Sequence, residues 1–104
     1  MDNLKRIINP QVLKITAGNY TEHQCFTLTK NTREFTMYSR TTGAVLRWRF
    51  STPHELYETD GEYYTIPNGE TGGLKDIYVK NDITVFVTTS TANTVLEIAI
   101  YPGL

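Results

Sequence analysis

Cysteines, histidines and long apolar runs are scarce in this chain, and each scarcity excludes a class of protein. The single cysteine, Cys25, cannot form a disulfide within the chain, and no cysteines and histidines have the spacing of a zinc site. No apolar run approaches the roughly 18 residues of a membrane-spanning helix, and the amino terminus lacks the apolar stretch of a secretory signal. We therefore expect a protein made in a reducing cytoplasm, with no contact to a membrane.

Neither sign of charge dominates. Ten lysines and arginines stand against eleven aspartates and glutamates, which gives a formal net charge of −1. Binding to nucleic acid depends on a basic footprint, so the overall balance argues against a nucleic-acid partner and leaves only a local patch open. The acidic stretch around Asp60-Gly61-Glu62 contains only a fragment of a calcium loop, and we interpret it as a solvated loop.

Catalytic motifs are also missing. The two histidines, His23 and His54, belong to no recognisable triad, and the serines lack the nucleophile-elbow pattern. No carboxylate pair or metal set is visible from the spacing. We therefore expect no enzyme activity and no cofactor.

Residues that favour β-strands are abundant. The chain has seventeen threonines against three serines, together with seven tyrosines. Threonine and tyrosine suit the half-buried surface of a strand, where branched or flat side chains pack on their cross-strand neighbours. Short stretches that alternate between apolar and polar residues are separated by turn residues such as Asn, Gly, Asp and Pro.

This pattern predicts an all-β protein of about eight strands, folded as an antiparallel β-sandwich or a small jelly roll. Residues 1–10 are expected to form a separate N-terminal arm, and residues 11–104 a single domain. A helical turn is expected after Ser51, and a flexible loop bracketed by Asn68-Gly69 and Gly72-Gly73. The expected strands are Val12–Thr16, Tyr20–Lys30, Glu34–Arg40, Ala44–Ser51, Tyr63–Ile66, Lys75–Lys80, Ile83–Thr89 and Thr94–Tyr101.

Two groups of residues are candidates for binding a partner. Ile7 and Ile8 lie in the arm and would need a neighbour to bury them, either another subunit or the chain's own domain. The second group is an arginine and tyrosine face that consists of Tyr38, Arg40, Arg47 and Arg49, with the first two joining the others across the turn Thr41–Gly43. Such a face can bind another subunit, or stack the bases of single-stranded nucleic acid. Ordinary pairing with Glu34 or Glu97 is the structural alternative.

The last forty residues resemble a class of small structural proteins from tailed bacteriophages. In that class a tyrosine-rich strand leads through an I-P-x-G turn and an I-Y-V-K strand to a closing strand with the pattern A-N-T-V-x-E-I. The corresponding residues here are Tyr64–Gly69, Ile77–Lys80 and Thr89–Ile98. The match is a pattern of strands and turns without a catalytic signature.

The resemblance implies a noncatalytic virion structural protein, of the capsid decoration or head or tail accessory type. Such a protein acts as an oligomer, for example a trimer, and binds a capsid or tail protein in the virion after synthesis in the cytoplasm of the bacterial host. The arm with Ile7 and Ile8 and the arginine face are the first and second candidates for these contacts. The alternative is a small β-barrel module that binds single-stranded nucleic acid or a glycan through the arginine and tyrosine face.

Overall fold

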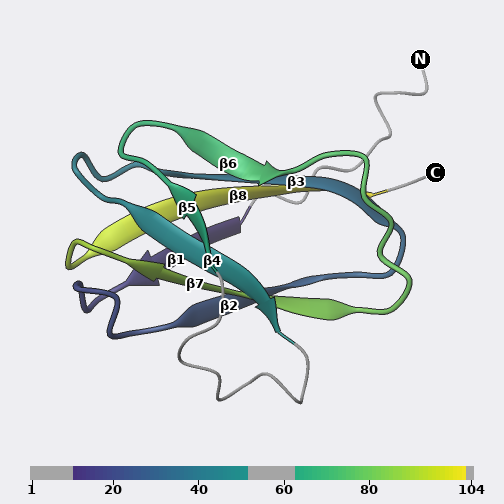
Figure 1. Cartoon of the computed structure of the whole chain (residues 1–104), viewed down its shortest axis with the longest axis horizontal. Helices are drawn as coiled ribbons and strands as arrows, with labels where there is room; N and C mark the ends of the chain where they lie inside the picture. The colour runs from purple at the N-terminus through teal and green to yellow at the C-terminus, as the bar shows by residue number, and fades with distance from the viewer. Residues whose placement is uncertain (1–10, 52–62, 103–104) are drawn as a thin grey trace.

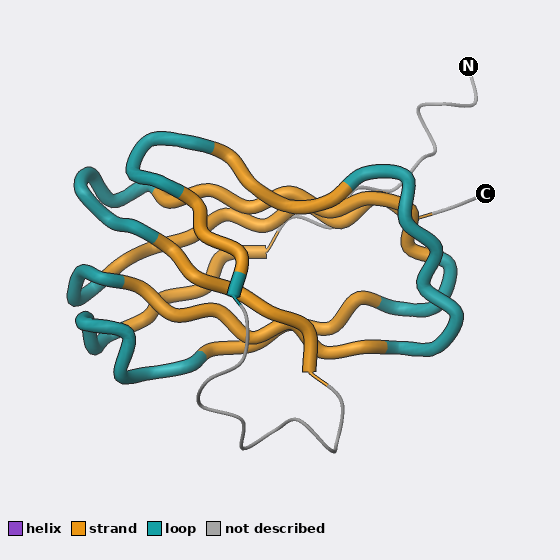
Figure 2. The backbone as a smooth tube through the Cα atoms, viewed as in Figure 1, coloured by secondary structure: helices purple, strands orange, loops and turns teal. Residues whose placement is uncertain are grey.

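The computed structural model describes residues 11–51 and 63–102, and these residues contain eight β-strands and no helix (Figures 1 and 2). Connecting loops gather at the two ends of the strands (Figure 2). The expected arm with Ile7 and Ile8 and the expected helical turn lie outside the described residues. The strands are β1 (Gln11–Ile15), β2 (Gln24–Leu28), β3 (Thr32–Ser39), β4 (Leu46–Ser51), β5 (Tyr64–Ile66), β6 (Thr71–Leu74), β7 (Ile83–Thr89) and β8 (Thr94–Pro102).

The strands form two antiparallel four-stranded sheets. Sheet A has the order β1-β8-β3-β6, and sheet B has the order β2-β7-β4-β5. The pairs β1–β8, β2–β7, β3–β6 and β4–β5 are nested, as in one long hairpin that has been rolled up. Pairing of β3 with β8 and of β4 with β7 then completes the two sheets. This is the topology of a jelly roll, so the expected fold class is confirmed.

Strict alternation explains how the sheets pack. In β8 the side chains of Leu96, Ile98 and Ile100 are buried, and the residues between them are half-buried on the opposite side. The inward side chains of both sheets make one core, in which Trp48 is 1% exposed and Phe35 fully buried. Their ring centroids lie 5.1 Å apart in an edge-to-face arrangement, which is the geometry that aromatic quadrupoles favour.

The expected strand Lys75–Lys80 is wrong, and a strand forms instead at β6, where a flexible loop was expected. Ile77 and Val79 do pack on the core, which explains their alternation. Their backbones, however, bond to the start of β3 and the turn before it: the Ile77 amide donates to the carbonyl of Arg33 in β3, and the carbonyl of Val79 accepts from the amide of Asn31 in the turn. The alternation of apolar and polar residues in this segment thus predicts burial correctly and strand pairing incorrectly.

The strand expected over Tyr20–Lys30 begins only at Gln24. Asn19 and Tyr20 both have a φ of 59°, so the chain turns here and does not extend. A positive φ is a genuine outlier for a bulky residue such as tyrosine. The end of β7 stabilises this turn, because the amides of Asn19 and Tyr20 donate to the carbonyls of Ser90 and Thr89.

Candidate binding faces

Each sheet has an outer face that points away from the core, and the candidate binding residues are divided between the two. Tyr38 and Arg40 lie on or beside the outer face of sheet A, whereas Arg47 and Arg49 lie on the outer face of sheet B. The expected continuous face across the turn Thr41–Gly43 is therefore wrong, because β3 and β4 belong to different sheets.

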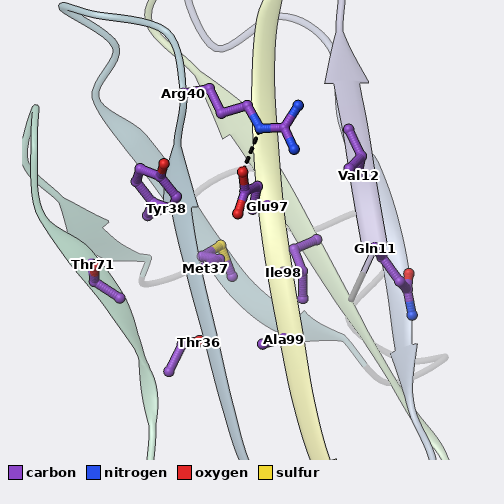
Figure 3. Close-up of a pocket in the computed structure, with 10 residues that line it drawn as sticks. All are labelled: Gln11, Val12, Thr36, Met37, Tyr38, Arg40, Thr71, Glu97, Ile98 and Ala99. Atoms are coloured by element: carbon purple, nitrogen blue, oxygen red, sulfur yellow. Dashed lines mark hydrogen bonds and ion pairs between the residues drawn. The ribbon is translucent and has the colours of Figure 1, made fainter. Parts of the chain in front are cut away.

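The outer face of sheet A carries a shallow hollow of about 150 Å³ (Figure 3). β1, β8, β3 and β6 all contribute to it, so the hollow spans the width of the sheet. The residues that line it are Gln11, Val12, Thr36, Met37, Tyr38, Arg40, Thr71, Glu97, Ile98 and Ala99.

The hollow arises where a row of larger residues lies next to a row of small ones. Val12 opposes Glu97, which opposes Tyr38 on the next strand. In the neighbouring row Ala99 opposes Thr36, and Thr36 opposes Gly73. Small side chains in the second row leave the space that larger ones would fill.

Gly73 can be only glycine in this position. Its φ is +125°, and a Cβ atom added to it would lie 2.0 Å from the carbonyl oxygen of Phe35. The neighbouring Gly72 faces inward, where an added Cβ would lie 2.4 Å from the side chain of Ile66. The two glycines therefore allow β6 to lie close against β3 and over β5. They belong to a strand, although glycine is depleted in strands.

Two apolar side chains remain exposed on this face. Val12 is 56% and Tyr38 39% exposed, and they lie on either side of Glu97 (Figure 3). Glu97 forms an ion pair with Arg40, which is one of the two ordinary pairings that the sequence offers as an alternative to partner binding. The pair neutralises both charges, so the hollow is bordered by exposed apolar groups and one closed ion pair.

On the outer face of sheet B the arginines pack against aromatic side chains, although Arg47 itself stays exposed. The guanidinium carbon of Arg47 lies 3.8 Å from the centre of the Tyr20 ring, within the range of a cation–π contact. Thr88, the cross-strand neighbour of Arg47, is only 2% exposed although it faces outward. The strained backbone at Tyr20 thus places its ring where it packs with Arg47.

Arg49 makes a second arginine–aromatic contact on this face. Arg49 is 8% exposed, and its guanidinium lies 5.8 Å from the centre of the Tyr63 ring. The Tyr63 hydroxyl is 3.3 Å from Nε2 of His23, and the His23 ring packs edge-on against Phe86 at 6.2 Å. Partial burial and, to a lesser extent, the charge of Arg49 lower the pKa of His23. Alternation in Ala44–Ser51 predicts that Arg49 points to solvent as part of the binding face, and this is wrong, because Arg49 is buried in this cluster.

Residues 11–51 and 63–102 contain neither a cluster of metal ligands nor a membrane-spanning helix. No group of three His, Cys, Asp or Glu side chains there is placed to hold a metal ion. No helix long and apolar enough to cross a membrane occurs among the same residues. The acidic fragment Asp60-Gly61-Glu62 lies outside the described part of the chain.

No protein-family model matches this chain, and no curated protein is similar to it in sequence. The fold and the two outer faces are therefore the observations from which a function can be argued.

Sequence reasoning found Tyr38 and Arg40 and missed the rest of the hollow. Val12 and Glu97 were already assigned to strands, and the outward position of Glu97 follows from alternation alone. The missing information was the order of the strands in the sheet, because β1 and β8 come from opposite ends of the chain.

Proposed function

We propose that this protein is a noncatalytic structural protein of a tailed-bacteriophage virion, of the capsid decoration or head or tail accessory type, that binds a viral protein surface as an oligomer. The outer face of sheet A is the surface that makes the contact. The observation that carries the proposal is the exposure of Val12 and Tyr38 around a hollow lined by small residues.

The size of the hollow supports a protein partner over a small molecule. Sites for metabolites and cofactors enclose roughly 300–1,000 Å³ and surround most of the ligand. The hollow measures about 150 Å³ and opens across a sheet face, which is enough for one protruding side chain of a partner. An exposed tyrosine beside such a hollow is the kind of anchor that interfaces use.

The viral part of the proposal is supported by the resemblance of the last forty residues and, more weakly, by the jelly roll. Jelly rolls occur in viral capsid proteins, but also in lectins and cupins, so the fold by itself is an analogy. Self-association fits the proposal because a modest interface per copy suffices when several copies bind one lattice.

The proposal is tested on gradient-purified virus particles from the genome that encodes the chain. We expect mass spectrometry to detect the chain in the particles in many copies. The variant Tyr38→Ala is expected to be lost from the particles, and Arg47→Ala, on the opposite face, to be retained. Absence of the wild-type chain from the particles would refute the viral function, and equal retention of both variants would refute the assignment to sheet A.

One contact favours a second function, the binding of single-stranded nucleic acid or a glycan through sheet B. Arg47 already stacks on Tyr20, and it makes no ion pair within residues 11–51 and 63–102. A stacked guanidinium with free N–H groups can bind a phosphate or a sugar hydroxyl. This function predicts salt-sensitive oligonucleotide binding, or saturable glycan binding, that Arg47→Ala abolishes.

A further inference from the structure

β2 lies at one edge of sheet B. β2 pairs with β7 on one side and has no strand on its other side within the described residues. An unpaired edge presents a row of backbone N–H and C=O groups that can template pairing with another strand.

The other three sheet edges carry features that oppose such pairing. β1 contains the exposed Lys14, β5 has only three residues and is followed by Pro67, and β6 is distorted at Gly73. Charges, proline, shortness and local distortion are the devices by which natural sheets protect their edges. β2 has none of them: Gln24–Leu28 is uncharged, contains no proline and pairs with β7 in unbroken register.

Two opposite charges flank this edge symmetrically. Glu22 lies four residues before Phe26, and Lys30 lies four residues after it. Lys30 is exposed and Glu22 half-buried, and the amide of Ala17 and the side chain of Gln24 each donate a hydrogen bond of 2.9 Å to the Glu22 carboxylate. These bonds orient Glu22 in the folded chain and leave further acceptor positions on its oxygens.

We propose that β2 pairs with β2 of a second copy, antiparallel and centred on Phe26. In this register Glu22 of each copy opposes Lys30 of the other, so two charge pairs close the ends of the strand pair. Joining the two four-stranded B sheets gives one sheet of eight strands about a twofold axis. The inference goes beyond the proposed function, because the pairing leaves the outer face of sheet A free whatever that face binds.

The dimer is tested first by sedimentation. A single strand edge is a small interface, so we expect a concentration-dependent equilibrium between monomer and dimer with a dissociation constant in roughly the micromolar range. A chain that stays monomeric at about 1 mM, well above this range, would overturn the proposal, and so would a trimer.

A charge introduced on β2 distinguishes the β2 contact from contacts made elsewhere on the chain. Thr27 is exposed on β2, and Thr65 is exposed on β5 at the opposite edge of sheet B. We expect Thr27→Lys to abolish the dimer and Thr65→Lys to leave it unchanged, with the same melting temperature for both. Equal dimerisation of the two variants would contradict the β2 contact.

The register is tested by cysteine chemistry, with the native Cys25, which is exposed, as one thiol. In the proposed register Cys25 directly opposes position 27 of the second copy, at a separation that a disulfide can span. Two native Cys25 residues lie on a diagonal, at roughly 7–8 Å between their Cα atoms, which is too far. We therefore expect Thr27→Cys to give a covalent dimer on mild oxidation, and the wild type and Thr29→Cys to give none.

Charge reversal tests the two flanking pairs. We expect Lys30→Glu to weaken the dimer about tenfold, since two symmetry-related pairs become repulsive. The double variant Glu22→Lys with Lys30→Glu is expected to restore it. If the double variant is as weak as Lys30→Glu while its melting curve shows a folded chain, the register is wrong. None of these variants alters the hollow on sheet A, so loss of the dimer with retained binding to virus particles would leave the proposed function standing.

Discussion

The two outer faces of this jelly roll use similar residues in opposite ways. On sheet B, Arg47 and Arg49 lie against the rings of Tyr20 and Tyr63, and Arg49 is almost fully buried. On sheet A the arginine that lines the hollow, Arg40, pairs with Glu97 and leaves Val12 and Tyr38 exposed beside it.

The difference shows that a cluster of arginines and tyrosines in a sequence does not by itself locate a binding surface. When aromatic side chains of the same face pack against the cations, as they do on sheet B, those contacts stabilise the sheet itself. When small residues leave a hollow and the apolar side chains stay exposed, the face is left open to a partner. The account therefore predicts that changes on sheet B affect mainly stability, and that changes on sheet A affect mainly binding.

Substitution of Gly73, which lies at the edge of the hollow, is expected to cause the largest loss of stability. Gly73→Ala combines a positive φ with a backbone clash, and we expect it to lower the free energy of unfolding by about 3 kcal/mol or more. Gly69→Ala is the matched control: Gly69 also has a positive φ, of +84°, but open space around it, so the cost is about 1 kcal/mol. Urea unfolding measures both, and equal losses would show that β6 does not lie against Phe35 as described.

The next effect compares the faces directly. Phe86 packs with His23 on sheet B, so Phe86→Ala is expected to cost about 2 kcal/mol, less than a fully buried phenylalanine would. Val12→Ala on sheet A removes a side chain that is 56% exposed and is expected to change stability by no more than about 0.5 kcal/mol. If Val12→Ala were the more damaging change, the description of sheet A as an open face would be wrong.

Lowering the pH is expected to cause a smaller loss of stability, through His23 on sheet B. The pKa of His23 is lowered in the folded chain, so the unfolded chain takes up the proton first as the pH falls below about 6.5. The stability that the neutral imidazole contributes is present above that pH, and is lost as the pH falls toward the folded pKa. His23→Gln should reduce this dependence, and NMR titration should give His23 a lower pKa in the native chain than in urea. A native pKa at or above the urea value would contradict the buried cluster.

The fold class could be predicted from the sequence, because alternation and turn residues report which side chains are buried and where the chain reverses. The alternation in Ala44–Ser51 and in Thr94–Tyr101 predicts that Trp48 and Leu96 point inward, and both are buried. The strand β6 could not be predicted, because Gly72 and Gly73 are required by close contacts with Ile66, which lies in the other sheet, and with Phe35, which comes from the first half of the chain. For the same reason the pairing of β1 with β8, which creates the hollow, was beyond sequence reasoning.

The central claim is that the hollow on sheet A makes the contact with the partner, and two matched variants test it most directly. Ala99→Tyr fills the hollow, whereas Thr65→Tyr adds the same ring to the exposed outer face of sheet B. Both are exchanges on a sheet surface where tyrosine is a favoured strand residue, so we expect stable, folded proteins. The account predicts that Ala99→Tyr is missing from purified virus particles while Thr65→Tyr is incorporated like the wild type. Incorporation of Ala99→Tyr at the wild-type level would contradict it.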